Sequence, residues 1–203
     1  MKALYDLDQT IVRIVPKWVR LAFDKEPGLA RKIAAKVPDY EDSWADVDKK
    51  ITDYRMDLFF DFNAYENHLF CACMDECKDF YQEFTGIDIP RFGIEGVEEI
   101  VVISQSDEES RASRSKKELL EEWKRRGKIA DWLFTSSKLH NKATVVANVF
   151  KDYDFMAEDH PRYPIQVCKT LSGIKIHLVE YPYNKETMRF LRIAFPERLI
   201  GHG

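Results

Sequence analysis

Short apolar runs that stop abruptly at polar side chains recur along this chain, and they constrain its fold more than any other feature. The run near Met1 and the runs at residues 100–103 and 154–157 have the continuous hydrophobic character of strands buried in a parallel sheet. The residues that end these three runs are Asp6 and Asp8, Ser104, and Glu158 with Asp159. Polar residues in these places are expected to meet at one edge of the sheet.

Helical segments separate the predicted strands. Two more strands are predicted at residues 131–135 and 174–179. The predicted helices span residues 115–126 with Ser115 as N-cap, residues 142–150 with Asn141 as N-cap, and residues 185–193. Strands that alternate with helices predict an α/β fold with a doubly wound parallel sheet.

The stretch between the first two strands, about 90 residues, is too long for a simple crossover connection. Helices are predicted in it at residues 17–25, 29–36 and 66–84, with an irregular acidic stretch at 39–62. We therefore expect an inserted, mainly α-helical cap at residues 16–95. The core domain is expected to comprise residues 1–15 and 96–203.

Glycine is scarce, with 8 residues among 203, which is about half the usual share of roughly 7%. These glycines form neither a G-x-G-x-x-G nor a G-x-x-x-x-G-K-[ST] motif. Dinucleotide binding of the Rossmann type and P-loop nucleotide hydrolysis are therefore not expected. If this protein binds phosphate, it must do so with a site other than a glycine-rich loop.

The net charge of −4 provides no overall attraction to nucleic acids or anionic membranes. The basic stretch at residues 111–126 is interleaved with glutamates and is interpreted as a solvated helix face, with a nucleic-acid strip as the alternative. No apolar run approaches the roughly 18 residues of a membrane span, and acidic residues by position 6 argue against a signal peptide. A cytoplasmic protein without membrane or nucleic-acid polymer partners is expected.

His68, Cys71, Cys73 and Cys77 have the residue types of a zinc site. On a helix, at about 100° per residue, His68 and Cys71 lie on one side, whereas Cys73 and Cys77 lie nearly opposite. Diverging ligands cannot close a tetrahedral site, so buried, reduced thiols are predicted instead.

Carboxylates that converge beyond the strand ends would repel one another unless a cation neutralises them. Mg²⁺ suits a site of one or two carboxylates plus a phosphate group. The strand-end residues therefore favour metal-assisted phosphoryl transfer.

Four segments, in this order, resemble the motifs of the haloacid dehalogenase superfamily of phosphatases. They are Asp6-Leu7-Asp8-Gln9-Thr10, Ser104 after its apolar strand, Lys142 at 16 residues before Glu158, and Phe155-Met156-Ala157-Glu158-Asp159. Two positions depart from the usual pattern. Gln9 replaces a glycine that many members carry, and Glu158 stands where aspartate is commoner.

The resemblance implies a Rossmann-like core and a role for each motif residue. Asp6 would be the nucleophile and Asp8 the general acid and base. Ser104 and Lys142 would bind the phosphoryl group. Mg²⁺ would be held by Asp6, by Asp8 through its carbonyl, and by one of Glu158 and Asp159.

Within the superfamily, the spacing of Lys142 before the acidic pair most resembles the 5′(3′)-deoxyribonucleotidases. This implies a Mg²⁺-dependent 5′-nucleotidase that acts on a small phosphomonoester, a (deoxy)nucleoside monophosphate, through an aspartyl-phosphate. Such proteins often form homodimers, although no sequence feature marks an interface here. Aromatic residues of the cap could stack on a base, and one ring of the doublet Phe59 and Phe60 is expected to face the pocket.

Two alternatives stay open. One is a phosphatase of the same type for another small ester or for a polynucleotide 3′-phosphate, against which the net charge argues. The other is a non-catalytic binding module that keeps the fold, against which the retention of Asp6, Asp8, Ser104 and Lys142 argues.

Overall fold

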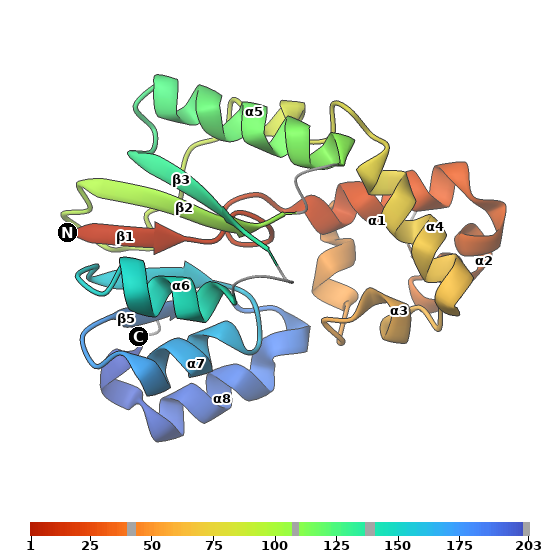
Figure 1. Cartoon of the computed structure of the whole chain (residues 1–203). Coiled ribbons are helices and arrows are strands. Elements are labelled where there is room, and N and C mark those ends of the chain that lie inside the picture. Colours follow the sequence, from red (N-terminus) through yellow and green to blue (C-terminus); the bar gives the residue numbers. More distant parts are fainter. Residues whose placement is uncertain (40–43, 107–109, 137–140, 201–203) are drawn as a thin grey trace.

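Five parallel strands form one sheet in the order β3–β2–β1–β4–β5 (Figure 1). The strands are β1 (Lys2–Tyr5), β2 (Glu99–Gln105), β3 (Asp131–Thr135), β4 (Phe155–Glu158) and β5 (Lys175–Leu178). The computed structural model describes residues 1–39, 44–106, 110–136 and 141–200. The predicted α/β class and parallel sheet are confirmed, and the arrangement is Rossmann-like.

Helices cover both faces of the sheet, because successive side chains on each strand point to opposite sides. On one face, Leu4, Ile103 and Met156 belong to a core shared with three helices. These helices are α6 (Lys142–Val149), α7 (Tyr163–Thr170) and α8 (Lys185–Ala194). On the other face, Tyr5 and Val102 share a core with α5 (Arg111–Arg125) and its buried Trp123.

In the described part of the chain between β1 and β2, four α-helices occupy the space beyond the carboxyl ends of the strands (Figure 1). They are α1 (Ile14–Lys25), α2 (Pro27–Lys36), α3 (Met56–Phe59) and α4 (Ala64–Asp75), with short 3₁₀ helices at Trp44–Lys50 and Gln82–Phe84. Trp18 of α1 stacks on Phe70 of α4 with ring centroids 4.5 Å apart. The division into a core domain of residues 1–15 and 96–203 and a cap of residues 16–95 stays a prediction.

Several helix boundaries differ from those expected. Ser110, not Ser115, is the N-cap of α5, because its side chain accepts the N–H of Ser113. The predicted helix at residues 66–84 is wrong beyond Asp75, where α4 ends. Helix α7, whose second residue is a proline, was not predicted at all. The predicted N-cap Asn141 is confirmed, since its side chain accepts the N–H of Ala143.

The four cysteines are free thiols, with Cys73 and Cys168 buried and Cys71 and Cys77 half-buried. Within the described ranges, no helix combines the length and the apolar character that a bilayer crossing requires. The acidic stretch at 39–62 and the polar residues that follow Ser104 lie partly outside the described residues.

Candidate active site

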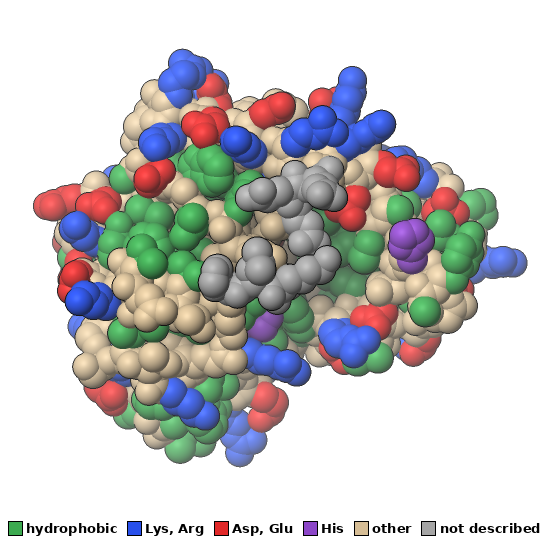
Figure 2. Space-filling view, in the orientation of Figure 1, with side chains coloured by type: hydrophobic (Ala, Val, Ile, Leu, Met, Phe, Trp, Pro, Cys, Tyr) green, Lys and Arg blue, Asp and Glu red, His purple; other side chains and the backbone are tan. Residues whose placement is uncertain are grey.

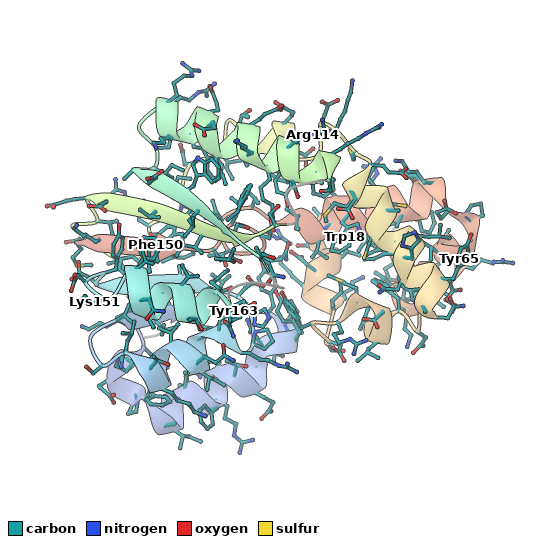
Figure 3. The ribbon with its side chains drawn as sticks, viewed as in Figure 1. Trp18, Tyr65, Arg114, Phe150, Lys151 and Tyr163 are labelled. Atoms are coloured by element: carbon teal, nitrogen blue, oxygen red, sulfur yellow. The ribbon has the colours of Figure 1, made fainter. Side chains whose placement is uncertain are left out.

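A cavity of about 520 Å³ lies where the carboxyl ends of the strands face α1 and α4. All six residues predicted to carry the chemistry line it: Asp6, Asp8, Ser104, Lys142, Glu158 and Asp159. In Figure 3, Trp18 lies on the helical side and Tyr163 at the start of α7 on the sheet side, and both line the cavity. Figure 2 shows hydrophobic side chains in the recess between these two parts. The cavity therefore has a charged floor and a largely apolar wall.

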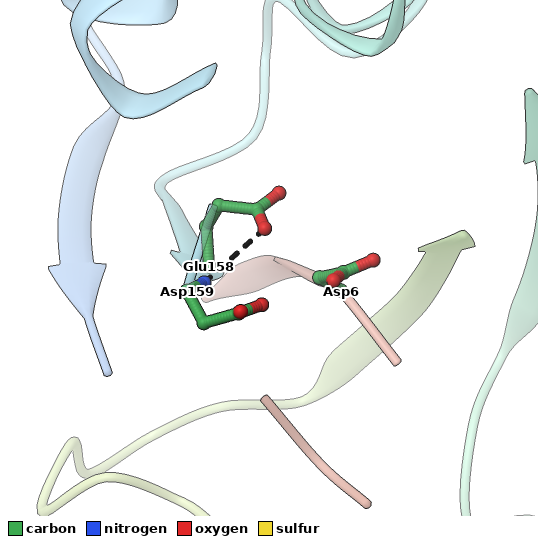
Figure 4. Close-up of side chains that lie close together, drawn as sticks. All are labelled: Asp6, Glu158 and Asp159. Atoms are coloured by element: carbon green, nitrogen blue, oxygen red, sulfur yellow. Dashed lines mark hydrogen bonds between the residues drawn. The ribbon is translucent and has the colours of Figure 1, made fainter. Parts of the chain in front are cut away.

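Three buried carboxylates form the floor of the cavity. One oxygen each of Asp6, Glu158 and Asp159 lies within 4.8 Å of the others (Figure 4). They meet because β1 and β4 are neighbours, and the N–H of Asp6 donates to the carbonyl of Ala157 at 2.9 Å. Among the described residues, no other group of three or more His, Cys, Asp or Glu side chains is close enough to share an ion.

Lys142, the first residue of α6, lies between two of these acids. Its Nζ is 2.5 Å from Oδ1 of Asp6 and 2.9 Å from Oε2 of Glu158. Burial by itself lowers the pKa of Lys142, but the carboxylates of Asp6 and Glu158 outweigh burial and raise it. Lys142 is therefore a fixed positive charge.

One lysine does not neutralise three acids. Burial, followed by repulsion from Glu158, raises the pKa of Asp6 to about 7. The same two causes raise the pKa of Asp159 well above its ordinary value. A cluster of hard oxygen donors with excess negative charge fits a divalent cation such as Mg²⁺. Asp6, Glu158 and Asp159 are the residues that could hold it.

Glu158 and Asp159 are both fixed in place. Oε1 of Glu158 accepts the N–H groups of Asp159 at 3.2 Å and His160 at 3.0 Å. Asp159 accepts the hydroxyl of Thr10 at 3.2 Å and that of Tyr183 at 2.6 Å. The orientation of both carboxylates in the acidic cluster is thus set by their neighbours.

The carboxylate of Asp8 lies outside the acidic cluster. The expectation that its carbonyl holds the metal stays a prediction. Its Oδ1 accepts the hydroxyl of Tyr81 at 2.8 Å, and its Oδ2 lies 2.5 Å from Nζ of Lys116. Lys116 also donates to Ser104 Oγ at 3.2 Å. Sequence reasoning missed Tyr81 and Lys116 as site residues.

A periodic signal for Lys116 was present in the sequence. The buried face of α5 includes Ala112, Lys116, Leu119, Leu120 and Trp123, and Lys116 stands in line with the apolar residues. A lysine inside such a stripe is expected to point inward. The stretch 111–126 is therefore not simply a solvated face, as it was interpreted.

The expectation that Phe59 or Phe60 faces the pocket is wrong, since neither residue lines the cavity. Phe60 is fully buried, and its ring packs on Phe62 with centroids 5.3 Å apart. The doublet fills the core of the helical part. Aromatic lining comes instead from Trp18, Phe70 and Tyr81, among others.

Gln9 adopts a backbone conformation that favours glycine, with φ at +58°. Two hydrogen bonds of its side chain offset the cost of this conformation. Nε2 donates to the buried Asp48 at 3.1 Å, and Oε1 accepts the N–H of Val15 at 2.9 Å. The turn that presents Asp6 and Asp8 is thereby tied to the helical part of the chain.

No protein-family model matches this chain, and no curated protein matches its sequence. The residues of the cavity can together hold a divalent cation, present a carboxylate nucleophile and bind a phosphoryl group. These capabilities come from the geometry of Asp6, Ser104 and Lys142 around one cavity.

Substitution of Gln9 by glycine and by alanine separates backbone strain from side-chain bonding. Both variants lose the two hydrogen bonds, and each is expected to lower the free energy of unfolding by about 1–3 kcal/mol. Only glycine relieves the left-handed conformation, so Gln9→Gly should be about 1 kcal/mol more stable than Gln9→Ala in urea unfolding. At most positions an alanine variant is more stable than a glycine variant. That order at position 9 would contradict this account.

Asp159→Asn tests, through thermal unfolding, whether the acidic cluster of Asp6, Glu158 and Asp159 binds Mg²⁺. In a chelator, the variant should melt a few degrees above the wild type, because one of three mutually repelling buried charges is gone. Added Mg²⁺ should raise the melting temperature of the wild type and of the exposed control Asp152→Asn, but hardly that of Asp159→Asn. An unchanged response to Mg²⁺ in Asp159→Asn would rule out Asp159 as a ligand.

Proposed function

We propose that this protein is a Mg²⁺-dependent phosphomonoester hydrolase of the haloacid dehalogenase type. One observation supports the proposal: the residues of all four motifs come from separate strand or helix ends, between positions 6 and 159, and line a single cavity. The clearest case of motif residues that are distant in the chain and meet here is Lys142, which contacts both Asp6 and Glu158. In this proposal, the helices α1 to α4 are the cap that selects the substrate.

The first step is attack by the Asp6 carboxylate on phosphorus. A bond forms between an Asp6 oxygen and phosphorus while the bond from phosphorus to the ester oxygen breaks. The electron pair of that bond goes to the leaving oxygen, which takes a proton from Asp8. The products of this step are the free alcohol and an aspartyl-phosphate.

The second step returns the protein to its starting state. A water oxygen attacks phosphorus and gives its proton to the Asp8 carboxylate, and the Asp6 carboxylate leaves. Inorganic phosphate is released, and Asp8 again carries the proton that the next turnover needs.

Lys142 and Ser104 stabilise the charge of the transferring group. Lys142 holds one oxygen of Asp6, which orients the nucleophile. Ser104 accepts a hydrogen bond from Lys116, so its own hydroxyl proton can be donated to a phosphoryl oxygen. Mg²⁺ held by Asp6 and by one of Glu158 and Asp159 would neutralise the negative charge of the phosphoryl group.

The apolar wall supports a nucleoside monophosphate as the substrate. Trp18 lines the cavity and is held in place by its Nε1, which donates to the carbonyl of Phe70 at 2.8 Å. A fixed aromatic ring offers a stacking surface for a base, worth about 1–3 kcal/mol. The charged floor then receives the 5′-phosphate.

The proposal is tested by phosphate release from a panel of nucleotides, sugar phosphates and a 3′-phosphorylated oligonucleotide. Release should require Mg²⁺, stop in chelator, be fastest with a nucleoside 5′-monophosphate, and fall by at least about 10³-fold in Asp6→Asn. The control Asp152→Asn should match the wild type. Activity that survives Asp6→Asn, or no release from any substrate, would overturn the proposal, and preference for the oligonucleotide would overturn the choice of substrate.

A further inference from the structure

Two residues that do not touch the reacting atoms in the proposed steps hold both oxygens of Asp8. Lys116 of α5 reaches Oδ2 at 2.5 Å, and Tyr81, from the segment after α4, donates its hydroxyl to Oδ1 at 2.8 Å. Lys116 and Tyr81 are both buried, whereas the side chain of Asp8 is 26% exposed. The Nζ of Lys116 also lies over the Tyr81 ring, 5.3 Å from its centroid.

We propose that Lys116 and Tyr81 are positioning residues that orient Asp8 for proton transfer to the leaving group. The inference rests on the proposed function, in which Asp8 is the acid and the base. Neither residue needs to touch the substrate. Each acts by fixing one oxygen of the carboxyl group.

The two contacts have different consequences for the carboxyl group of Asp8. Oδ2 accepts from the Lys116 ammonium at 2.5 Å, which leaves Oδ1 as the oxygen through which a proton can pass to the leaving group. A carboxyl oxygen has two acceptor sites, and Tyr81 occupies only one at Oδ1. The remaining site can carry the proton toward the leaving oxygen, with its direction set by the Tyr81 hydroxyl.

Helix α5 sets the position of both contacts. Lys116 lies on its buried face, and the hydroxyl of Ser115 accepts the backbone N–H of Tyr81 at 2.9 Å. A rigid element that places two supporting residues keeps a catalytic group within the narrow tolerance that proton transfer needs. The same helix also supports Ser104 through Lys116.

The dependence of the rate on the leaving group tests the proposal. A general acid matters most when the leaving oxygen is a poor leaving group. Phenyl phosphate and p-nitrophenyl phosphate have similar shapes, but nitrophenolate leaves readily without a proton. The probe is therefore kcat/KM for both esters, which reports the step that forms the aspartyl-phosphate.

In Tyr81→Phe, kcat/KM for phenyl phosphate should fall about tenfold or more, and that for p-nitrophenyl phosphate less than about threefold. Lys116→Met should lower both values, because Ser104 loses its donor as well, but it should lower that for phenyl phosphate more. Tyr153→Phe is the matched control, because the Tyr153 hydroxyl donates to a carboxylate, Glu99, that does not line the cavity. The control should change neither value.

Equal losses with both esters, or no loss with either, in folded Tyr81→Phe would overturn the positioning role while leaving the proposed function intact. Tyr81→Phe decides the test if Lys116→Met does not fold. A folded wild type that, with Mg²⁺, hydrolyses neither these esters nor any phosphomonoester of the panel above would overturn the proposed function itself, and the inference with it.

Discussion

Lys142 bridges two buried carboxylates, Asp6 beyond β1 and Glu158 at the end of β4, and the geometry of the site depends on this bridge. Parallel neighbouring strands bring the two acids together, with Asp159 alongside. Even beside Lys142, burial and repulsion from Glu158 raise the pKa of Asp6 to about 7 and that of Asp159 well above its ordinary value. The remaining excess of negative charge makes the floor of the cavity suited to a divalent cation.

The turn after β1 has a second set of supports, which come from outside the sheet. Gln9 reaches Asp48 in the Trp44–Lys50 helix, and Asp8 reaches Tyr81 after α4. Residues of the turn thus bond to the floor on one side and to the helical part on the other. A movement of the helical part relative to the sheet would act directly on Asp8.

The strand ends could be predicted from the sequence because a buried strand shows as an apolar run wherever it occurs. Asn141 was predicted for a similar reason, since helix caps are local signals. Lys142 was predicted only from its place among the four motifs. Lys116 could have been found from its place in the apolar stripe of α5. Tyr81 and the burial of Phe60 depend on contacts between segments far apart in the chain, which composition does not encode. Nor does the identity of Gln9 reveal its positive φ, because glutamine normally avoids that conformation. Helix α7 was missed because it is short and contains Pro164 near its start.

The central claim is that Asp6 carries the phosphoryl group during turnover. The most direct measurement is borohydride reduction of the protein quenched during turnover, followed by mass spectrometry of the peptide that contains Asp6. An acyl phosphate is reduced by borohydride to an alcohol, whereas a free carboxylate is not. The account predicts homoserine at position 6 only when substrate and Mg²⁺ are both present. An intact Asp6 in a protein that is releasing phosphate, or reduction at Asp8 instead, would contradict it.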